Sequence, residues 1–309
     1  MSAEELKKVY TDTVVDLALE NDDVFVVESD LSASIGTWSR RDELKEKFVN
    51  VGIMEAQGVG VSAGLSTINL YPFYHTFAAF ATRRVFDQLM VSLAYSKNYG
   101  TILGSDPGIC AVTNGGTHMC FEDLALVTAI PNIVVYDVSE PIQMREILKD
   151  NYNKKQLSYI RSSRKAFSNK LDDADFNLEQ GYSLLKKGND LTIFVSGILC
   201  EDALEAANAL DAEGYSVEVI ELFRIKPVNE DIIINAAKKG PIVTLDNHNI
   251  NGGLGSAVAN VVSEKYPQIV KKIGVQDKFG QVGTIPYLKE QYGLTAKHII
   301  MRCKELLVD

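Results

Sequence analysis

The sequence predicts an α/β protein of two domains, each a mainly parallel sheet covered by helices. Short apolar runs bounded by turn residues alternate with segments of helical periodicity almost throughout. Strands that are separated by helices pair in parallel and have both faces covered. The alternation stops once, in a polar stretch between about Lys165 and Asp190, and then resumes. A length of 309 residues also exceeds what one average domain needs.

The first domain, placed at residues 1–168, opens with a helix and a strand. Residues 6–19 carry apolar side chains at helical spacing, and residues 24–27 form a short apolar run between polar neighbours. The alternation then continues, with strands expected at residues 48–53, 101–103, 133–136 and 157–160, and helices at 84–95, 121–128 and 141–150.

A linker at residues 169–189 precedes the second domain, placed at residues 190–309. The same two patterns recur in it. We expect strands at residues 191–195, 217–222 and 242–245, and helices at 201–213 and 229–239. These elements predict a smaller α/β domain.

Composition excludes several classes of protein. The net charge is −10, with a pI near 5.0, and no block of Lys and Arg exceeds three residues, so a nucleic-acid surface is not expected. The acidic start of the chain and the absence of any apolar run of about 18 residues predict a cytoplasmic protein without a membrane segment. The cysteines have no C-x-x-C spacing and the four histidines form no H-E-x-x-H, so we expect reduced thiols and no metal site built by this chain alone.

Glu55 is the first candidate for chemistry. It follows the apolar run 48–53 and precedes the small-residue run 58–65, which places it at a turn from strand to helix. Open α/β sheets bind ligands at the carboxyl ends of their strands. A carboxylate buried there would be costly without a partner, whereas a solvated acid in a loop is the simpler alternative.

Two further segments carry candidate residues. Phe77 and Phe80 lie three residues apart, so on a helix they would share a face, either in the core or against a ligand. The glycine-rich stretch 104–118 ends in His118. Glycine permits close approach of the backbone to a ligand, and a histidine titrating near neutrality suits proton transfer at a sugar hydroxyl. Taken alone, His118 fits a structural role equally well.

Together these segments resemble transketolases. Glu55 stands at the glutamate of the family's Gly-Ile-x-Glu segment, which bonds a pyrimidine nitrogen of thiamine diphosphate and drives the tautomerisation that activates the cofactor. Phe77 and Phe80 match a Thr-Phe-x-x-Phe whose rings stack on the aminopyrimidine. The family has a further aromatic residue three positions after the second phenylalanine, and this chain has Arg83 at that position. Asp30 matches an aspartate that supports the cofactor.

The resemblance also implies a substrate site, with departures. His118 matches a histidine that contacts substrate hydroxyls, but the neighbouring aspartate position holds Asn114, the following glutamine is Met119, and a further family histidine is Ser105. These changes predict an atypical ketose, such as a branched or sulfonated one.

Two residues correspond to the family's binding site for the anionic tail of the sugar. Ser34 matches a serine that helps to hold the sugar phosphate, and Arg164 lies where the family keeps a phosphate-binding arginine. A guanidinium fork suits a phosphate or sulfonate. The alternative interpretation of Arg164 is an exposed arginine of the linker.

The second half of the chain resembles the transketolase C-terminal domain at residues 246–258. Gly253-Leu254-Gly255 lacks the third glycine of a dinucleotide fingerprint, so we interpret this loop as structural, at a subunit interface. No Gly-Asp-Gly occurs in the sequence, although a complete transketolase uses that motif to hold Mg²⁺ and the diphosphate. The resemblance therefore implies the C-terminal subunit of a split transketolase. A partner N-terminal subunit would hold the Mg²⁺ (or Ca²⁺), and the assembly is expected to be an α2β2 heterotetramer.

The implied activity is transfer of a two-carbon ketol unit between a ketose, phosphorylated or otherwise anionic, and an aldose phosphate. Such a transferase of pentose phosphate and carbohydrate metabolism would act only with its partner subunit. The β subunit of a 2-oxoacid dehydrogenase shares the two-domain plan, but Thr117-His118 and the segment 251–258 favour transketolase. A non-catalytic partner subunit is a second alternative, against which Glu55 argues.

Overall fold

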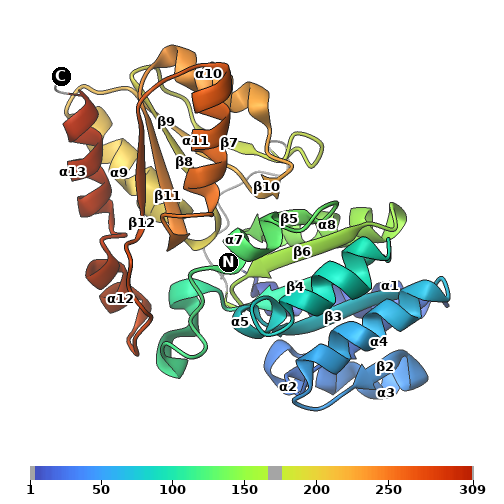
Figure 1. Cartoon of the computed structure of the whole chain (residues 1–309). Coiled ribbons are helices and arrows are strands. Elements are labelled where there is room, and N and C mark those ends of the chain that lie inside the picture. The colour runs from blue at the N-terminus through green and yellow to red at the C-terminus, as the bar shows by residue number, and fades with distance from the viewer. Residues whose placement is uncertain (1–3, 166–175, 308–309) are drawn as a thin grey trace. The chain divides into compact units, whose positions relative to one another are not determined.

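The structure, a computed structural model, describes residues 4–165 and 176–307. The chain forms two compact units (Figure 1): the first comprises residues 1–107 and 126–169, and the second residues 108–125 and 170–309. Both are mostly parallel sheets covered by helices, which confirms the predicted fold class. Residues 108–125, placed in the first domain from the sequence, group with the second unit.

The described strands of the first unit pair with one another in parallel. Among its described residues six strands pair in the spatial order β5-β6-β4-β3-β1-β2. They are β1 (Val24–Glu28), β2 (Phe48–Asn50), β3 (Tyr71–Phe77), β4 (Gly100–Ser105), β5 (Val134–Val138) and β6 (Leu157–Ser162). Since all run in one direction, their carboxyl ends meet at one edge of the sheet.

Helices lie on both faces of this sheet. They are α1 (Leu6–Glu20), α2 (Ser32–Ile35), α3 (Arg41–Leu44), α4 (Glu55–Thr67), α5 (Ala78–Ala81), α6 (Phe86–Gln88), the π-helix η3 (Leu89–Tyr95) and α8 (Pro141–Asn153), with 3₁₀ turns η1 (Thr37–Arg40) and η2 (Lys45–Lys47). The helix α7 (Asp123–Thr128) begins in residues of the second unit and ends in residues of the first.

Neighbouring residues of β3 face opposite helices. The Tyr74 ring lies against α4, where a Cβ at Gly58 would come within 2.6 Å of it. His75 faces α1 instead, with 6.1 Å between its ring centroid and that of Tyr10. Because side chains alternate along a strand, α4 and α1 cover opposite faces of the sheet.

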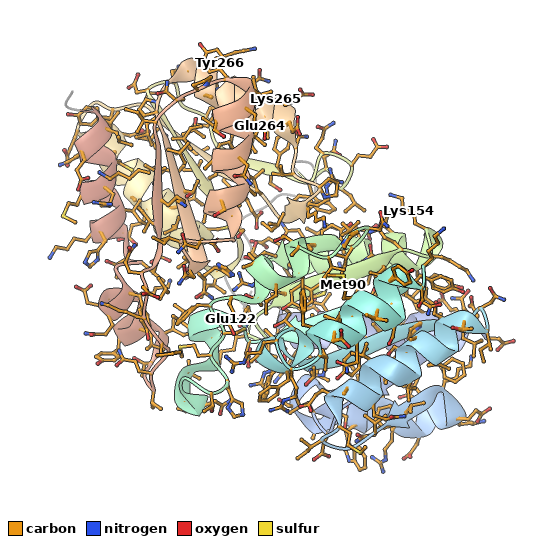
Figure 2. The ribbon with its side chains drawn as sticks, in the orientation of Figure 1. Met90, Glu122, Lys154, Glu264, Lys265 and Tyr266 are labelled. Atoms are coloured by element: carbon orange, nitrogen blue, oxygen red, sulfur yellow. The ribbon has the colours of Figure 1, made fainter. Side chains whose placement is uncertain are left out.

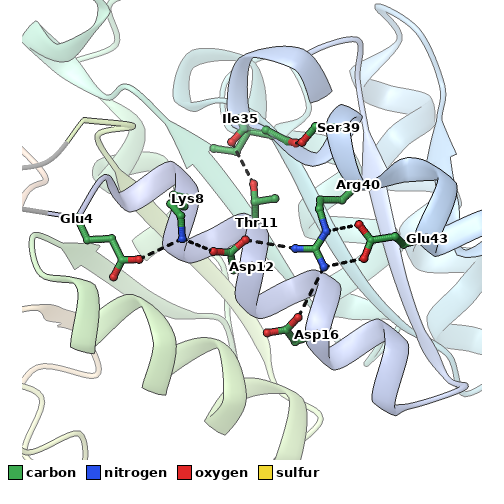
Figure 3. Close-up of polar contacts among 10 residues, drawn as sticks. Glu4, Lys8, Thr11, Asp12, Asp16, Ile35, Ser39, Arg40 and Glu43 are labelled. Carbon is green, nitrogen blue, oxygen red and sulfur yellow. Dashed lines mark hydrogen bonds and ion pairs between the residues drawn. The ribbon is translucent and has the colours of Figure 1, made fainter.

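The surface of α1 is tied to the segment that follows β1 by Arg40 (Figure 3). The guanidinium donates to Glu43 Oε2 at 2.8 Å and to Asp12 Oδ1 at 3.3 Å, and Asp16 lies 3.9 Å away. The bond from Arg40 holds the pKa of Glu43 below its ordinary value. Exposed ion pairs of this kind stabilise little, so the cluster reinforces α1 locally.

Two expectations from the sequence were wrong in detail. Residues 71–77 form a buried strand, so Phe77 closes β3 and Phe80 lies in the short α5 rather than both sharing one helix. Aromatic and β-branched residues favour strands, and two residues three positions apart do not distinguish the periodicity of a helix from that of a strand. The strand expected at residues 48–53 ends at Asn50, because Gly52 turns the chain with φ +73°. The strand β2 is half-buried, whereas we expected a buried strand.

The second unit has one antiparallel strand in an otherwise parallel sheet. Among its described residues the pairing order is β12-β11-β8-β9-β7, with β7 antiparallel. The strands are β7 (Ser183–Lys186), β8 (Leu191–Val195), β9 (Val217–Glu221), β11 (Ile242–Asn249) and β12 (Val270–Val275), and a short β10 (Arg224–Lys226) follows β9. The helices are α9 (Cys200–Ala212), α10 (Glu230–Lys239), α11 (Leu254–Lys265), α12 (Ile285–Tyr292) and α13 (Ala296–Leu307), with 3₁₀ turns η4 (Gly108–Asn114) and η6 (Gly197–Leu199).

Charged side chains cover the outer ends of several elements. Figure 2 shows Lys154, just after α8, and Glu264 and Lys265, at the end of α11, pointing outward. Within the part of the chain that the structure describes, no helix combines the length and the apolar character that a membrane span requires.

Candidate active site

Glu55 is the first residue of α4, at the predicted turn from strand to helix. The turn is held by Asn50, whose Oδ1 accepts the backbone N–H groups of Gly52 and Asp30 at 3.0 and 3.1 Å. A carboxylate in the first turn suits the helix dipole. Glu55 is only 4% exposed, and its cost of burial is offset by Arg84, whose Nη1 donates to Oε1 at 2.6 Å. The sequence did not suggest this partner.

Two aromatic rings adjoin this ion pair. The rings of Phe77 and Phe80 are tilted at 58° with centroids 6.2 Å apart. The Arg84 guanidinium lies 3.8 Å from the Phe80 centroid, within the range of a cation–π interaction, and that of Arg164 lies 5.3 Å from the Phe77 centroid. Arg84 therefore joins the acid to the aromatic pair.

Arg164 and Ser34, both expected from the sequence to bind the anionic tail of the sugar, lie in contact with each other. The Nη1 of Arg164 donates to the Ser34 hydroxyl. The same guanidinium also donates through Nε to Asp106 Oδ2 at 2.6 Å, and the Arg164 backbone N–H donates to Asp106 Oδ1 at 3.0 Å. Asp106 was missed from the sequence, although it directly follows Ser105. Its carboxylate neutralises the charge that an anionic tail would meet.

Ser105 belongs to a buried polar network. Its hydroxyl lies 3.0 Å from His75 Nε2, and His75 Nδ1 lies 2.8 Å from Glu28 Oε2. The other Glu28 oxygen accepts the Thr37 hydroxyl at 2.6 Å. Glu28 and His75 face each other directly across β1 and β3. None of these four side chains is more than 1% exposed.

The network constrains how Ser105 can act. An ionised carboxylate only accepts hydrogen bonds, so His75 donates from Nδ1 to Glu28. With Nδ1 donating, Nε2 of a neutral ring accepts the Ser105 hydroxyl, and Nε2 of a protonated ring donates to it. His75 and Glu28 were not suggested by the sequence, where each stands singly at the end or middle of an apolar run.

Asp30 lies just after β1. It adopts a left-handed backbone, φ +57°, and its side chain is exposed. Parallel strands therefore gather Asp30, Glu55, Phe77, Ser105 and Arg164 at their carboxyl ends, because each lies at or just after the end of a strand or of its connecting turn.

Asn114 and His118 belong to the second unit. Asn114 is exposed at the end of η4, and His118 Nδ1 lies 2.9 Å from the Thr117 hydroxyl. The loop packs on the segment before α12, where a Cβ at Gly116 would come within 2.6 Å of the Gly280 carbonyl. Glycine at position 116 is therefore required for this close packing.

The loop at residues 246–258 holds the start of α11. Asp246 Oδ2 accepts the backbone N–H of Leu254 at 2.7 Å, and a Cβ at Gly253 would lie 2.2 Å from the same oxygen. Gly253 thus lets the backbone at the start of α11 approach the Asp246 side chain closely. Within residues 4–165 and 176–307, no cluster of three or more His, Cys, Asp or Glu side chains could hold a metal ion.

Comparison with known proteins gives one consistent family. Residues 3–169 match the transketolase pyrimidine binding domain, and residues 181–299 match the transketolase C-terminal domain. The chain is 37% identical to the 6-deoxy-6-sulfo-D-fructose transketolase subunit SqwH of Clostridium sp., over 97% of this chain and 94% of that one. It is 32% identical to one subunit of the apulose-4-phosphate transketolase of Phocaeicola vulgatus, over 97% and 96%.

Solved structures agree with this match. A split gene transketolase, described as an inactive beta4 tetramer, superimposes with a TM-score of 0.88 at 35% identity, covering 99% of both chains. The transketolase of Campylobacter jejuni has the same fold, with a TM-score of 0.81 at 18% identity, over 98% of this chain and 47% of that one.

Proposed function

Because the chain belongs to the transketolase family, as the C-terminal subunit of a split transketolase that acts with a partner subunit, we propose that the pair transfers a two-carbon ketol unit from an anionic ketose to an aldose phosphate. In this proposal the partner's diphosphate site holds Mg²⁺ or Ca²⁺, and two copies of each chain form an α2β2 heterotetramer. The setting is cytoplasmic carbohydrate metabolism of the pentose phosphate type.

The ion pair of Glu55 and Arg84 against Phe80 carries the proposal. It displays a buried carboxylate and an aromatic face that together hold a planar cation with in-plane N–H donors. The aminopyrimidine of thiamine diphosphate, protonated on its ring, is likewise a planar cation with in-plane N–H donors. The residues present therefore fit the cofactor, which when bound supplies the electron sink for cleaving the bond next to the ketose carbonyl.

Each residue of this chain then has a defined task. Glu55 holds the proton at the pyrimidine nitrogen, while Phe77 and Phe80 stack on the ring and exclude water. Asp30, beside the Asn50 turn, supports the cofactor. Arg164 and Ser34 bind the anionic tail of the sugar.

Three further residues are assigned to the sugar hydroxyls. His118 and Asn114 contact hydroxyls, and His118 is the group that moves a proton at one of them. Ser105 acts from the end of β4, with its hydroxyl oriented by His75.

An atypical sugar is supported by three features. Ser105 and Asn114 replace a histidine and an aspartate that read a linear ketose phosphate in the family, and Asn can donate as well as accept. Asp106 neutralises Arg164, which lowers the preference for a doubly charged phosphate over a singly charged sulfonate. Two relatives are named as transketolase subunits for 6-deoxy-6-sulfo-D-fructose and for apulose 4-phosphate.

The test is a substrate screen with the purified partner subunit. We expect the wild-type pair to prefer a sulfonated or branched ketose over xylulose 5-phosphate. Asn114→Asp should shift kcat/KM towards xylulose 5-phosphate. A wild-type preference for xylulose 5-phosphate and ribose 5-phosphate over every unusual sugar would refute the atypical substrate.

The two alternatives have less support. Relatives at 37% and 32% identity that are named as transketolase subunits favour ketol transfer over the acyl transfer of a 2-oxoacid dehydrogenase β subunit. A non-catalytic subunit would have no use for a buried acid whose ion-pair partner, Arg84, is exposed to solvent. Assaying the pair with a ketose and with a 2-oxoacid separates all three functions, because a non-catalytic chain would support neither reaction.

A further inference from the structure

We infer that Arg84 is a positioning residue of the cofactor site that competes with the aminopyrimidine of thiamine diphosphate for Glu55 and Phe80. The inference rests on the proposed function, since it takes Glu55 and Phe80 as the cofactor's contacts. It adds a residue whose loss should strengthen cofactor binding rather than weaken it.

Geometry supplies the first argument. Arg84 donates to Glu55 Oε1 at 2.6 Å and places its guanidinium carbon 3.8 Å from the Phe80 ring centroid. These are one hydrogen bond to the acid and one stacking contact on the aromatic ring. Both are the contacts proposed for the aminopyrimidine, and a guanidinium resembles a protonated aminopyrimidine in planarity, charge and in-plane N–H donors.

Exposure supplies the second argument. The Glu55 side chain is 5% exposed, whereas the Arg84 side chain is 44% exposed. A buried carboxylate without a partner is costly, so the arginine stabilises Glu55. The arginine itself reaches solvent and is held at its tip, so it can swing away at small cost once another donor takes the carboxylate.

The competition sets the affinity of the cofactor. In this competition the aminopyrimidine takes the place of Arg84 at the Glu55 carboxylate and on the Phe80 ring, so cofactor binding breaks the Arg84–Glu55 ion pair. A charged hydrogen bond is worth more than a neutral one, but solvent screens a pair whose arginine is half exposed. Removing Arg84 should therefore tighten the Kd of thiamine diphosphate by about three- to tenfold.

The experiment measures that Kd directly. Wild-type chain and Arg84→Met, each reconstituted with the partner subunit, are titrated with thiamine diphosphate and Mg²⁺ in a calorimeter. The matched control is Arg145→Met, which removes the same charge from α8, where the arginine side chain is 38% exposed and pairs with Glu4. We expect Arg84→Met to bind about three- to tenfold tighter than wild type, and Arg145→Met to stay within about twofold.

Two further variants identify the contact. Arg84→Lys keeps a charged donor for Glu55 but loses the planar stacking on Phe80, so its Kd should lie between those of wild type and Arg84→Met. In a Glu55→Gln background the effect of Arg84→Met should largely disappear, because the carboxylate for which both groups compete is gone.

Failure of the competition and failure of the proposed function give different results. Weaker cofactor binding by Arg84→Met, or binding equal to that of Arg145→Met, overturns the competition. If Arg84→Met does not assemble with the partner, Arg84→Lys decides: a tighter Kd than wild type supports the inference, and an equal or weaker one overturns it. Failure of the wild-type pair to bind thiamine diphosphate at all would refute the proposed function itself.

Discussion

Glu28 and Glu55 are both buried in the first unit, yet their charges are held in opposite ways. Glu28 is fully enclosed and bonded by His75 and Thr37, which are themselves fully buried. Glu55 is also buried, but its ion-pair partner, Arg84, is 44% exposed on its outer side. An acid whose partners are all enclosed serves the fold, because exchanging them would require unfolding. An acid with a partner that can move into solvent is suited to exchange that partner for a ligand.

Replacing Glu55 tests the functional side of this comparison and should have the largest effect. Glu55→Gln removes the charge that we propose to hold a proton at the pyrimidine nitrogen. We expect turnover to fall by about 10²- to 10⁴-fold in the reconstituted pair. Steady-state rates measured with saturating cofactor check this. Retention of more than about a tenth of wild-type turnover would contradict the catalytic assignment.

Glu28→Gln is the matched control for that variant. It makes the same chemical change at the enclosed acid, so it should lower stability while turnover, measured below its unfolding temperature, stays within about tenfold of wild type. A loss of turnover as large as that of Glu55→Gln, in a folded protein, would show that the two acids do not differ as proposed.

Breaking the enclosed pair tests the structural side. His75→Leu leaves the Glu28 carboxylate buried with its strongest partner gone, which should lower the free energy of unfolding by about 3–5 kcal/mol. Urea denaturation followed by circular dichroism measures it. The double variant Glu28→Met with His75→Leu should be less destabilised than the sum of the single changes, because no charge is then left unpaired. A single-variant loss below about 1 kcal/mol would mean that the network contributes little.

The smallest expected effect concerns Tyr10, which packs beside His75. Burial, and after it the Glu28 carboxylate, raises the pKa of the Tyr10 hydroxyl well above its ordinary value. A folded-state pKa above the unfolded one contributes stability that is present below about pH 10 and is lost as the pH rises beyond it. The Tyr10 hydroxyl makes no hydrogen bond within the described residues.

Tyr10→Phe should therefore be close to neutral at pH 7, within about 1 kcal/mol, and should lose less stability than wild type between about pH 10 and 11. Urea midpoints of the two proteins across that range provide the measurement. If the urea midpoints of wild type and variant changed in parallel with pH, ionisation of the Tyr10 hydroxyl would not be destabilising the fold.

The sequence located the part of the site that is local in the chain. The apolar run, the Gly52 turn and the small-residue run that begins α4 lie next to one another, so the position of Glu55 at a helix start followed from neighbouring residues. The βα alternation fixed the fold class for the same reason. The strand β3 was missed because two phenylalanines three residues apart fit a helix face as well as the end of a strand.

The partners of these residues were decided only by the tertiary structure. Arg84 lies 29 positions from Glu55, His75 lies 47 from Glu28, and Arg164 lies 58 from Asp106. Strand order and register bring each pair together, and neither is written in the local periodicity of the sequence. The sequence by itself thus determined which residue types stand at the ends of the strands. The order in which the strands pair decided which charged partners these residues contact, because that order sets the distance between residues far apart in the chain.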